Sequence, residues 1–213
     1  RALSTADVSK LTTTQLAALS TLAAASLTAD QLIALTTTQA SGLATTQLSV
    51  LSASQAQYLE TADIAKLGTD QVRALSSAAL SGLTTSQVSS LSTTQLAALK
   101  TSQISGFNSS QIGSLSSANF LTLGTDQLAV ISATQIKGLQ AAAFANLSTD
   151  QLRSLGNSAI AALSTAQTSA LSAAKLSQLT TSQTAVLGAG SIAALTSDQA
   201  KNLTAGQVTA LTS

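Results

Sequence analysis

The sequence is marked first by the residues that it lacks. Its 213 residues include no His, Cys, Pro, Met or Trp, and only one Tyr and three Phe. Without His or Cys, the chain cannot build a Ser–His or Cys–His nucleophile, a thiol redox centre or a zinc site of the usual ligands. We therefore identify no catalytic, cofactor-binding or metal-ligating residue. We expect a protein that is not an enzyme, unless a domain outside this chain supplies the site.

Charge and long apolar runs are also scarce. Charged residues make up 8% of the chain and the net charge is +1. Nine dispersed basic residues give too little positive potential to hold nucleic acid or an anionic membrane surface. No run of 18 apolar residues occurs, although about 20 are needed to span a bilayer as a helix. We expect no nucleic-acid partner and no membrane insertion.

The sequence does contain an uninterrupted eight-residue repeat. Apolar residues stand at every eighth position from Leu3 to Leu203, and all are Leu except Phe107 and Ile131. Residues 3–210 form 26 octads without insertion or deletion, in the pattern L-[ST]-[TSA]-x-Q-[LIV]-x-[small]. Such periodicity predicts a repeat architecture. We interpret residues 1–213 as a single continuous array and expect it to be part of a longer one, or to stack end to end with other copies.

Each octad carries the signals of a helix start. Position 2 is Ser or Thr in 17 octads and position 5 is Gln in 17. This spacing is that of a capping box, in which the two side chains bond each other's backbone amides. Positions 1 and 6 match the two members of a hydrophobic staple, and position 6 is a large apolar residue in 20 octads. The pattern predicts one short helix in each octad, with a corner at positions 1 and 2.

These helices are predicted to stack as an all-α solenoid. A helix of about six residues is unstable alone in water, so neighbouring helices must hold it. The small or polar residues at position 6 all fall in alternate octads: Ala24, Ala40, Ala56, Thr168, Thr184 and Ala200. We interpret this alternation as two octads, or 16 residues, in each turn. A β-solenoid is the alternative, but positions 1 and 6 would lie on opposite faces of a continuous strand.

A few residues depart from the pattern. Glu60 and Asp63 occupy positions 2 and 5, where we interpret them as a capping arrangement and not as a metal site. Lys175 replaces Gln at position 5 and is expected to be solvated. The predicted core includes Phe107, Phe120 and Phe144, whereas Tyr58 at position 8 is either a surface or a contact residue. Asp150 and Arg153 have the i,i+3 spacing of a helical ion pair.

The gapless unit L-[ST]-x-x-Q-[LIV]-x-x resembles tandem arrays in giant secreted bacterial surface proteins of adhesin or filament type. The resemblance covers essentially the whole chain. It implies a structural rod or fibre that is secreted and lies at the cell surface or outside the cell. The expected partner is a second copy, contacted end to end or laterally. The alternative is a binding module whose Thr and Ser side chains hold glycan, a host surface or ice.

Overall fold

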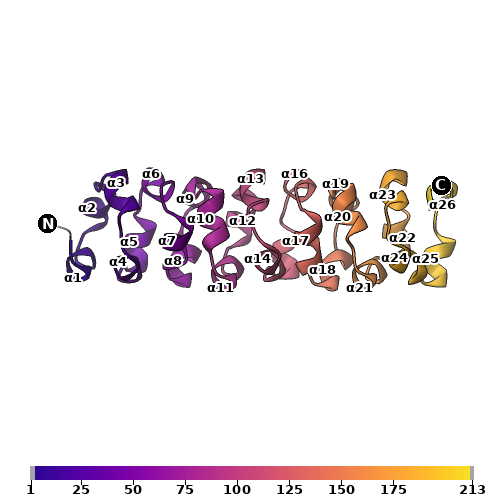
Figure 1. The fold of residues 1–213 in the computed structure, drawn as a ribbon, viewed down its shortest axis with the longest axis horizontal. Helices are drawn as coiled ribbons and strands as arrows, with labels where there is room; N and C mark the ends of the chain where they lie inside the picture. The colour runs from indigo at the N-terminus through magenta and orange to yellow at the C-terminus, as the bar shows by residue number, and fades with distance from the viewer. Residues whose placement is uncertain (1–2, 212–213) are drawn as a thin grey trace. The chain divides into compact units, whose positions relative to one another are not determined.

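The computed structural model describes residues 3–211, which form 26 short α-helices (Figure 1). Their contacts divide the chain into two compact units, Arg1–Phe107 and Asn108–Ser213, and each unit is described by itself. The described residues contain no β-strand, so the all-α prediction is confirmed and the β-solenoid is not supported. None of the described helices is long and apolar enough to cross a membrane.

The helices of unit 1 are α1 Thr5–Val8, α2 Thr13–Ala17, α3 Thr21–Ala25, α4 Ala29–Ile33, α5 Thr37–Ser41, α6 Thr45–Leu48, α7 Ala53–Ala56, α8 Thr61–Lys66, α9 Thr69–Ala74, α10 Ser77–Gly82, α11 Thr85–Ser89, α12 Thr93–Ala98 and α13 Thr101–Ile104. Those of unit 2 are α14 Ser109–Gly113, α15 Ser117–Phe120, α16 Thr125–Ala129, α17 Ala133–Gly138, α18 Ala141–Ala145, α19 Thr149–Ser154, α20 Asn157–Ala161, α21 Thr165–Ser169, α22 Ala173–Leu176, α23 Thr181–Ala185, α24 Ala189–Ala193, α25 Ser197–Lys201 and α26 Ala205–Leu211.

The capping boxes predicted from the octads begin most of these helices. At α2, the Thr12 amide donates to Gln15 Oε1 at 2.9 Å, and the Gln15 amide donates to Thr12 Oγ1 at 3.2 Å. Thr12 itself has an extended backbone, with φ −68° and ψ 160°. No described residue has a positive φ, so the corners between helices need no left-handed glycine.

Each turn of the solenoid contains three octads, so the prediction of two octads in each turn was wrong. Every prominent helix contact joins a helix to the third one after it, as in the stack α2, α5, α8 and α11 of unit 1. The same step gives the stack α14, α17, α20, α23 and α26 in unit 2. Figure 1 shows this in unit 1, where α3 and α6 lie side by side along one edge. One turn therefore spans 24 residues.

The alternation at position 6 has a different physical cause. Because three is odd, octads that alternate along the sequence also alternate along each stack. Ala40 in α5 thus lies between α2 and α8, which carry Leu16 and Ile64 at the same position. Thr184 in α23 lies between α20 and α26 in the same way. Alternating small and large side chains fills a core without voids or overlap.

The core consists of positions 1 and 6, as the staple pattern predicts. Leu16, Leu48 and Ile64 are fully buried at position 6, and Leu91 and Leu123 at position 1 are almost so. Burial of one such side chain contributes about 1.5–3 kcal/mol.

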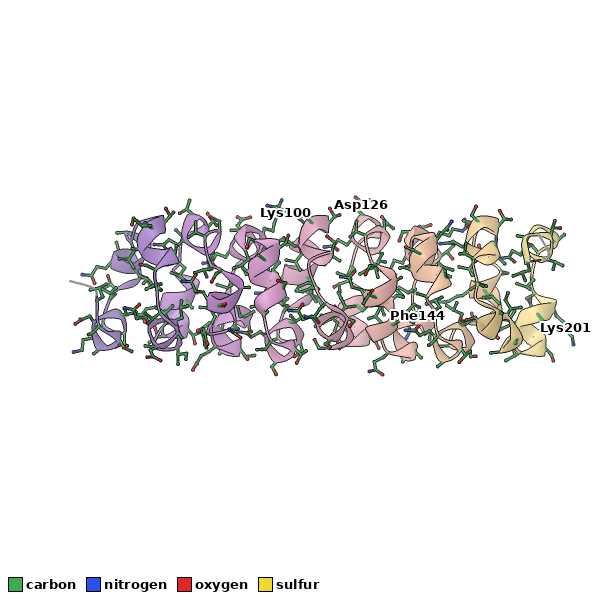
Figure 2. The ribbon with its side chains drawn as sticks, viewed as in Figure 1. Lys100, Asp126, Phe144 and Lys201 are labelled. Carbon is green, nitrogen blue, oxygen red and sulfur yellow. The ribbon has the colours of Figure 1, made fainter. Side chains whose placement is uncertain are left out.

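The three phenylalanines all lie in this core, which confirms their predicted place. The Phe120 and Phe144 rings, from stacked helices α15 and α18, have centroids 6.5 Å apart. Figure 2 shows Phe144 inside the fold, whereas Lys100, Asp126 and Lys201 point outward.

Candidate functional site

The glutamines at position 5 form the main polar network of both units. In most of them Oε1 accepts from the corner amide of its own octad, while Nε2 donates to backbone carbonyls of the preceding turn. For Gln95, Oε1 accepts from the Ser92 amide at 2.7 Å. Its Nε2 donates to the carbonyls of Ile64 and Leu67, at 2.9 and 2.8 Å. One amide therefore caps a helix and joins two turns.

We call these residues the bridging glutamines. Each donates to the carbonyl of the position-1 residue 28 places earlier, at 2.5–3.0 Å: Gln31, Gln39, Gln47, Gln55, Gln71, Gln87, Gln95, Gln103, Gln151, Gln167, Gln183, Gln199 and Gln207. Most also reach the position-6 carbonyl 31 places earlier, as Gln39 does with Val8.

The network solves a problem that short helices create. The last four carbonyls of an α-helix have no partner within it, and in helices of 4–7 residues these carbonyls are a large share of the backbone. An unpaired buried polar group costs about 1–3 kcal/mol. The bridging glutamines supply donors at the corners, where a position-1 carbonyl such as that of Leu67 accepts from no backbone amide, whereas the position-6 carbonyl of Ile64 also accepts from the Leu67 amide.

Other donors can replace the glutamine amide. Ser191 Oγ donates to the Leu163 carbonyl, 28 places earlier, at 3.2 Å, and accepts from Thr168 Oγ1. Lys175 donates from Nζ to the Leu147 carbonyl, also 28 places earlier. The prediction that Lys175 is solvated was therefore wrong, because its side chain is half-buried and takes over the bridging role.

The pair Glu60 and Asp63 is a charged exception in unit 1, where Ala23 and Ala79 also lack a side-chain donor at position 5. The Glu60 amide donates to Asp63 Oδ2 at 3.2 Å, which confirms half of the predicted capping arrangement. The Glu60 side chain makes no cap hydrogen bond. Asp63 is only 1% exposed, and its Oδ1 has no hydrogen-bond partner. Burial raises the pKa of Asp63, against the opposing effect of its hydrogen bonds to the Glu60 backbone and the Thr37 side chain.

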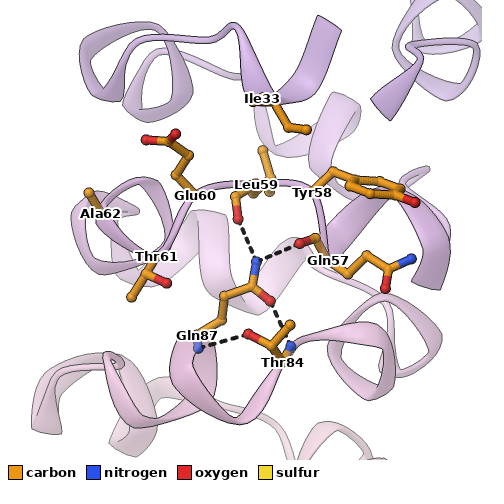
Figure 3. A pocket seen from close by; sticks show the side chains of 9 residues that line it. All are labelled: Ile33, Gln57, Tyr58, Leu59, Glu60, Thr61, Ala62, Thr84 and Gln87. Atoms are coloured by element: carbon orange, nitrogen blue, oxygen red, sulfur yellow. Dashed lines mark hydrogen bonds between the residues drawn. The ribbon is translucent and has the colours of Figure 1, made fainter. Parts of the chain in front are cut away.

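A shallow groove of about 540 Å³ lies beside this pair in unit 1. Its walls include Tyr58 and Glu60, which are the chain's only Tyr and only Glu, and Ile33, a large residue at a position that is usually small. The Ile33 and Tyr58 side chains are 48% and 39% exposed. Figure 3 shows Tyr58 and Glu60 projecting to either side of Leu59, with Ile33 beyond them.

The base of the groove is held by a bridging glutamine. Figure 3 shows Gln87 Nε2 donating to the carbonyls of Leu59 and Gln57, while its Oε1 accepts from the Thr84 amide. The groove therefore combines an exposed phenol ring, a carboxylate and an aliphatic side chain on a fixed base. Such a surface can contact a ligand, although it contains no nucleophile with an adjacent base.

The remaining charged residues do not gather into a site. The sequence pairs Asp150 with Arg153, but Arg153 Nε instead donates to the Gln178 carbonyl at 2.7 Å, in the following turn. Within residues 3–211, no three acidic side chains come close enough together to hold a metal ion.

The bridging role is what sequence reasoning missed, although a signal for it exists. A capping box accepts Glu as readily as Gln, and a helix N-terminus favours the negative charge. Yet position 5 holds 17 Gln and no Glu. The preference for Gln over Glu indicates that the amide NH₂ group is needed as a donor. Contact with another turn explains this need.

The fold and this network define the chain as an α-helical repeat solenoid. A family model described as the ALTTAQ repeat matches residues 57–93 and 144–181, together about a third of the chain. The first match covers much of the groove and the second covers Lys175. Segments close to the motif ALTTAQ occur at residues 34–39 (ALTTTQ) and 162–167 (ALSTAQ). Each runs from position 8 of one octad to position 5 of the next. No curated protein matches the sequence.

Proposed function

We propose that this repeat protein is a non-enzymatic structural array that self-associates at the bacterial cell surface or outside the cell. The observation that carries the proposal is the bridging network, which joins each turn to the next with the same donors and acceptors. A turn without a neighbour leaves such groups exposed.

The surface supports the same proposal. Thr and Ser provide most of its polar cover, because most of the glutamines are buried, and charged residues are only 8% of the chain. Neighbouring copies would therefore repel each other little, and their contacts would depend only weakly on salt. The fibre would assemble through hydrogen bonds and small side chains.

Sedimentation velocity and electron microscopy over a range of concentrations test this proposal. We expect oligomers that grow with concentration in both low and high salt. Val208, 48% exposed in α26, and Val50, 38% exposed beside α6, offer a matched pair. Val208→Asp should block end-to-end contact while Val50→Asp leaves it intact, and lateral contact predicts the reverse. A monomer at every concentration would refute self-association.

The groove favours a second candidate function, the binding of a glycan. An exposed Tyr ring stacks on the apolar face of a sugar, and Glu60 accepts hydrogen bonds from its hydroxyls. A glycan array should then show binding by the monomer. Tyr58→Ala should abolish it, and replacement of the exposed Lys100 by Ala should not. Equal signals from wild type and Tyr58→Ala would exclude the groove as the site.

A further inference from the structure

Asp63 stands where an amide donor stands in most other octads. By equivalence with the bridging glutamines, its Oδ2 takes the place of Oε1, because it accepts from the Glu60 amide. Its Oδ1 then corresponds to Nε2, on a side chain that is one methylene shorter. The carbonyl 28 places before Asp63 is that of Leu35, and the one 31 places before is that of Leu32. Asp63 Oδ1 is buried and unpaired, and no described residue donates to the Leu35 carbonyl.

We propose that Asp63 is a proton-operated contact between two turns of unit 1. As a neutral acid, it donates a hydrogen bond from Oδ1 to the Leu35 carbonyl and replaces the glutamine amide. As a carboxylate, it presents a negative oxygen to the negative end of a carbonyl dipole, and the contact opens. Asp63 gains one proton from solvent and no other group changes its bonding.

The helices packed against Asp63 bring no positive charge to it, and its carboxyl is held by hydrogen bonds to the Glu60 backbone and to the Thr37 side chain of α5. Helix α8 packs against α5 and α11, and neither contains a titratable residue. The charged groups nearest to Asp63 in the sequence are Glu60, before α8, and Lys66, at the end of α8. Burial is the main cause of the raised pKa of Asp63; the negative charge of Glu60 adds to it, whereas the hydrogen bond from the Glu60 backbone lowers the pKa.

The contact joins the two walls of the groove. Ile33 belongs to the corner that Asp63 faces, and Tyr58 and Glu60 precede α8. Protonation therefore draws the walls together, and ionisation releases them. Because the chain has one Tyr and no Trp, its intrinsic fluorescence reports on Tyr58 alone. This inference does not depend on self-association or on glycan binding.

Two titrations of the full chain test the proposal. The carbon-13 NMR signal of the Asp63 carboxyl, assigned by its loss in Asp63→Asn, should titrate with a midpoint above the ordinary value of 3.8. Tyr58 emission should change with the same midpoint in the wild type, and this transition should vanish in Asp63→Asn. A midpoint at or below 3.8 would overturn the proposal, and so would a Tyr58 transition that persists in Asp63→Asn.

Unfolding by urea provides the variant comparison. The raised pKa means that the stability contributed by Asp63 is fully present below about 3.8 and is lost as pH rises through the folded value. The urea midpoint of the wild type should therefore rise on acidification from neutral pH, relative to that of Asp63→Asn and Asp63→Gln. A midpoint that instead rises with added Na⁺, K⁺ or Ca²⁺ at neutral pH would show a cation-binding carboxylate and overturn the proposal.

Discussion

The corner that Asp63 faces in unit 1 and the corner that Lys175 faces in unit 2 replace the same glutamine with opposite charges. Lys175 donates to the Leu147 carbonyl, 28 places earlier, as a glutamine does. Asp63 cannot donate while ionised, and one of its oxygens stays unpaired. The comparison indicates that position 5 favours a hydrogen-bond donor and accepts different side chains that supply one, although Ala stands there in four octads. A donor is needed because position-1 backbone carbonyls of the preceding turn would otherwise lack a hydrogen-bond partner.

The largest effect is expected when the donor of a buried bridging glutamine is removed. Gln95→Glu keeps the capping bond from Ser92 but loses the two donations to Ile64 and Leu67, and it buries a carboxylate. We expect a loss of about 2–4 kcal/mol in the free energy of unfolding, measured in urea at neutral pH.

Gln15→Glu is the matched control for that change. Gln15 makes the same capping bond but is exposed, with no turn beneath it in the described chain. We expect a change within about 0.5 kcal/mol. Equal losses for the two variants would show that capping alone explains the glutamines.

A smaller effect is expected at Lys175. Lys175→Ala removes the donor to the carbonyl of the buried Leu147 and should cost about 1–2 kcal/mol. Lys175→Gln restores an amide donor and should stay within about 0.5 kcal/mol of the wild type. Thermal or urea unfolding of both variants measures the difference, and a loss as large for Gln as for Ala would contradict the donor requirement.

The smallest effect concerns Asp7, the other acid at position 5. It is exposed, and hydrogen bonds from the Ser4 side chain and backbone lower its pKa. Its contribution to stability is therefore present above about 3.8 and is lost as pH falls through the folded value, the opposite sign to Asp63. Asp7→Asn should weaken the fall in urea midpoint on acidification. No change in that slope would show that the Ser4 contact does not stabilise the fold.

The sequence predicted the helices and the core but not the number of octads in each turn. The Ser/Thr and Gln spacing and the apolar positions 1 and 6 are local signals, and local geometry decides where a short helix begins. The bend at each corner depends on contacts with residues 28 and 31 places away, which a single octad does not contain. The alternation of small and large residues at position 6, such as Ala40 and Ile64, was therefore interpreted as the number of octads in a turn. It reflects instead how side chains of successive turns pack on each other.

The sequence identified the unusual residues of the candidate site but not which of them lie together. Tyr58, Glu60 and Asp63 stand out as departures from the octad. Ile33 joins them only because it lies one turn earlier, at a distance in sequence that the 24-residue turn sets. The bridging role of Gln was recoverable from the absence of Glu at position 5, whereas the replacement of Gln by Lys175 required the structure.

The odd number of octads in a turn has an evolutionary consequence. Deleting or duplicating one octad leaves every position-5 side chain above an equivalent carbonyl, but it places large position-6 residues on large ones and small on small. Deleting or duplicating two octads preserves both relations. We therefore expect such arrays to lengthen and shorten in steps of 16 residues, although the protein folds in steps of 24.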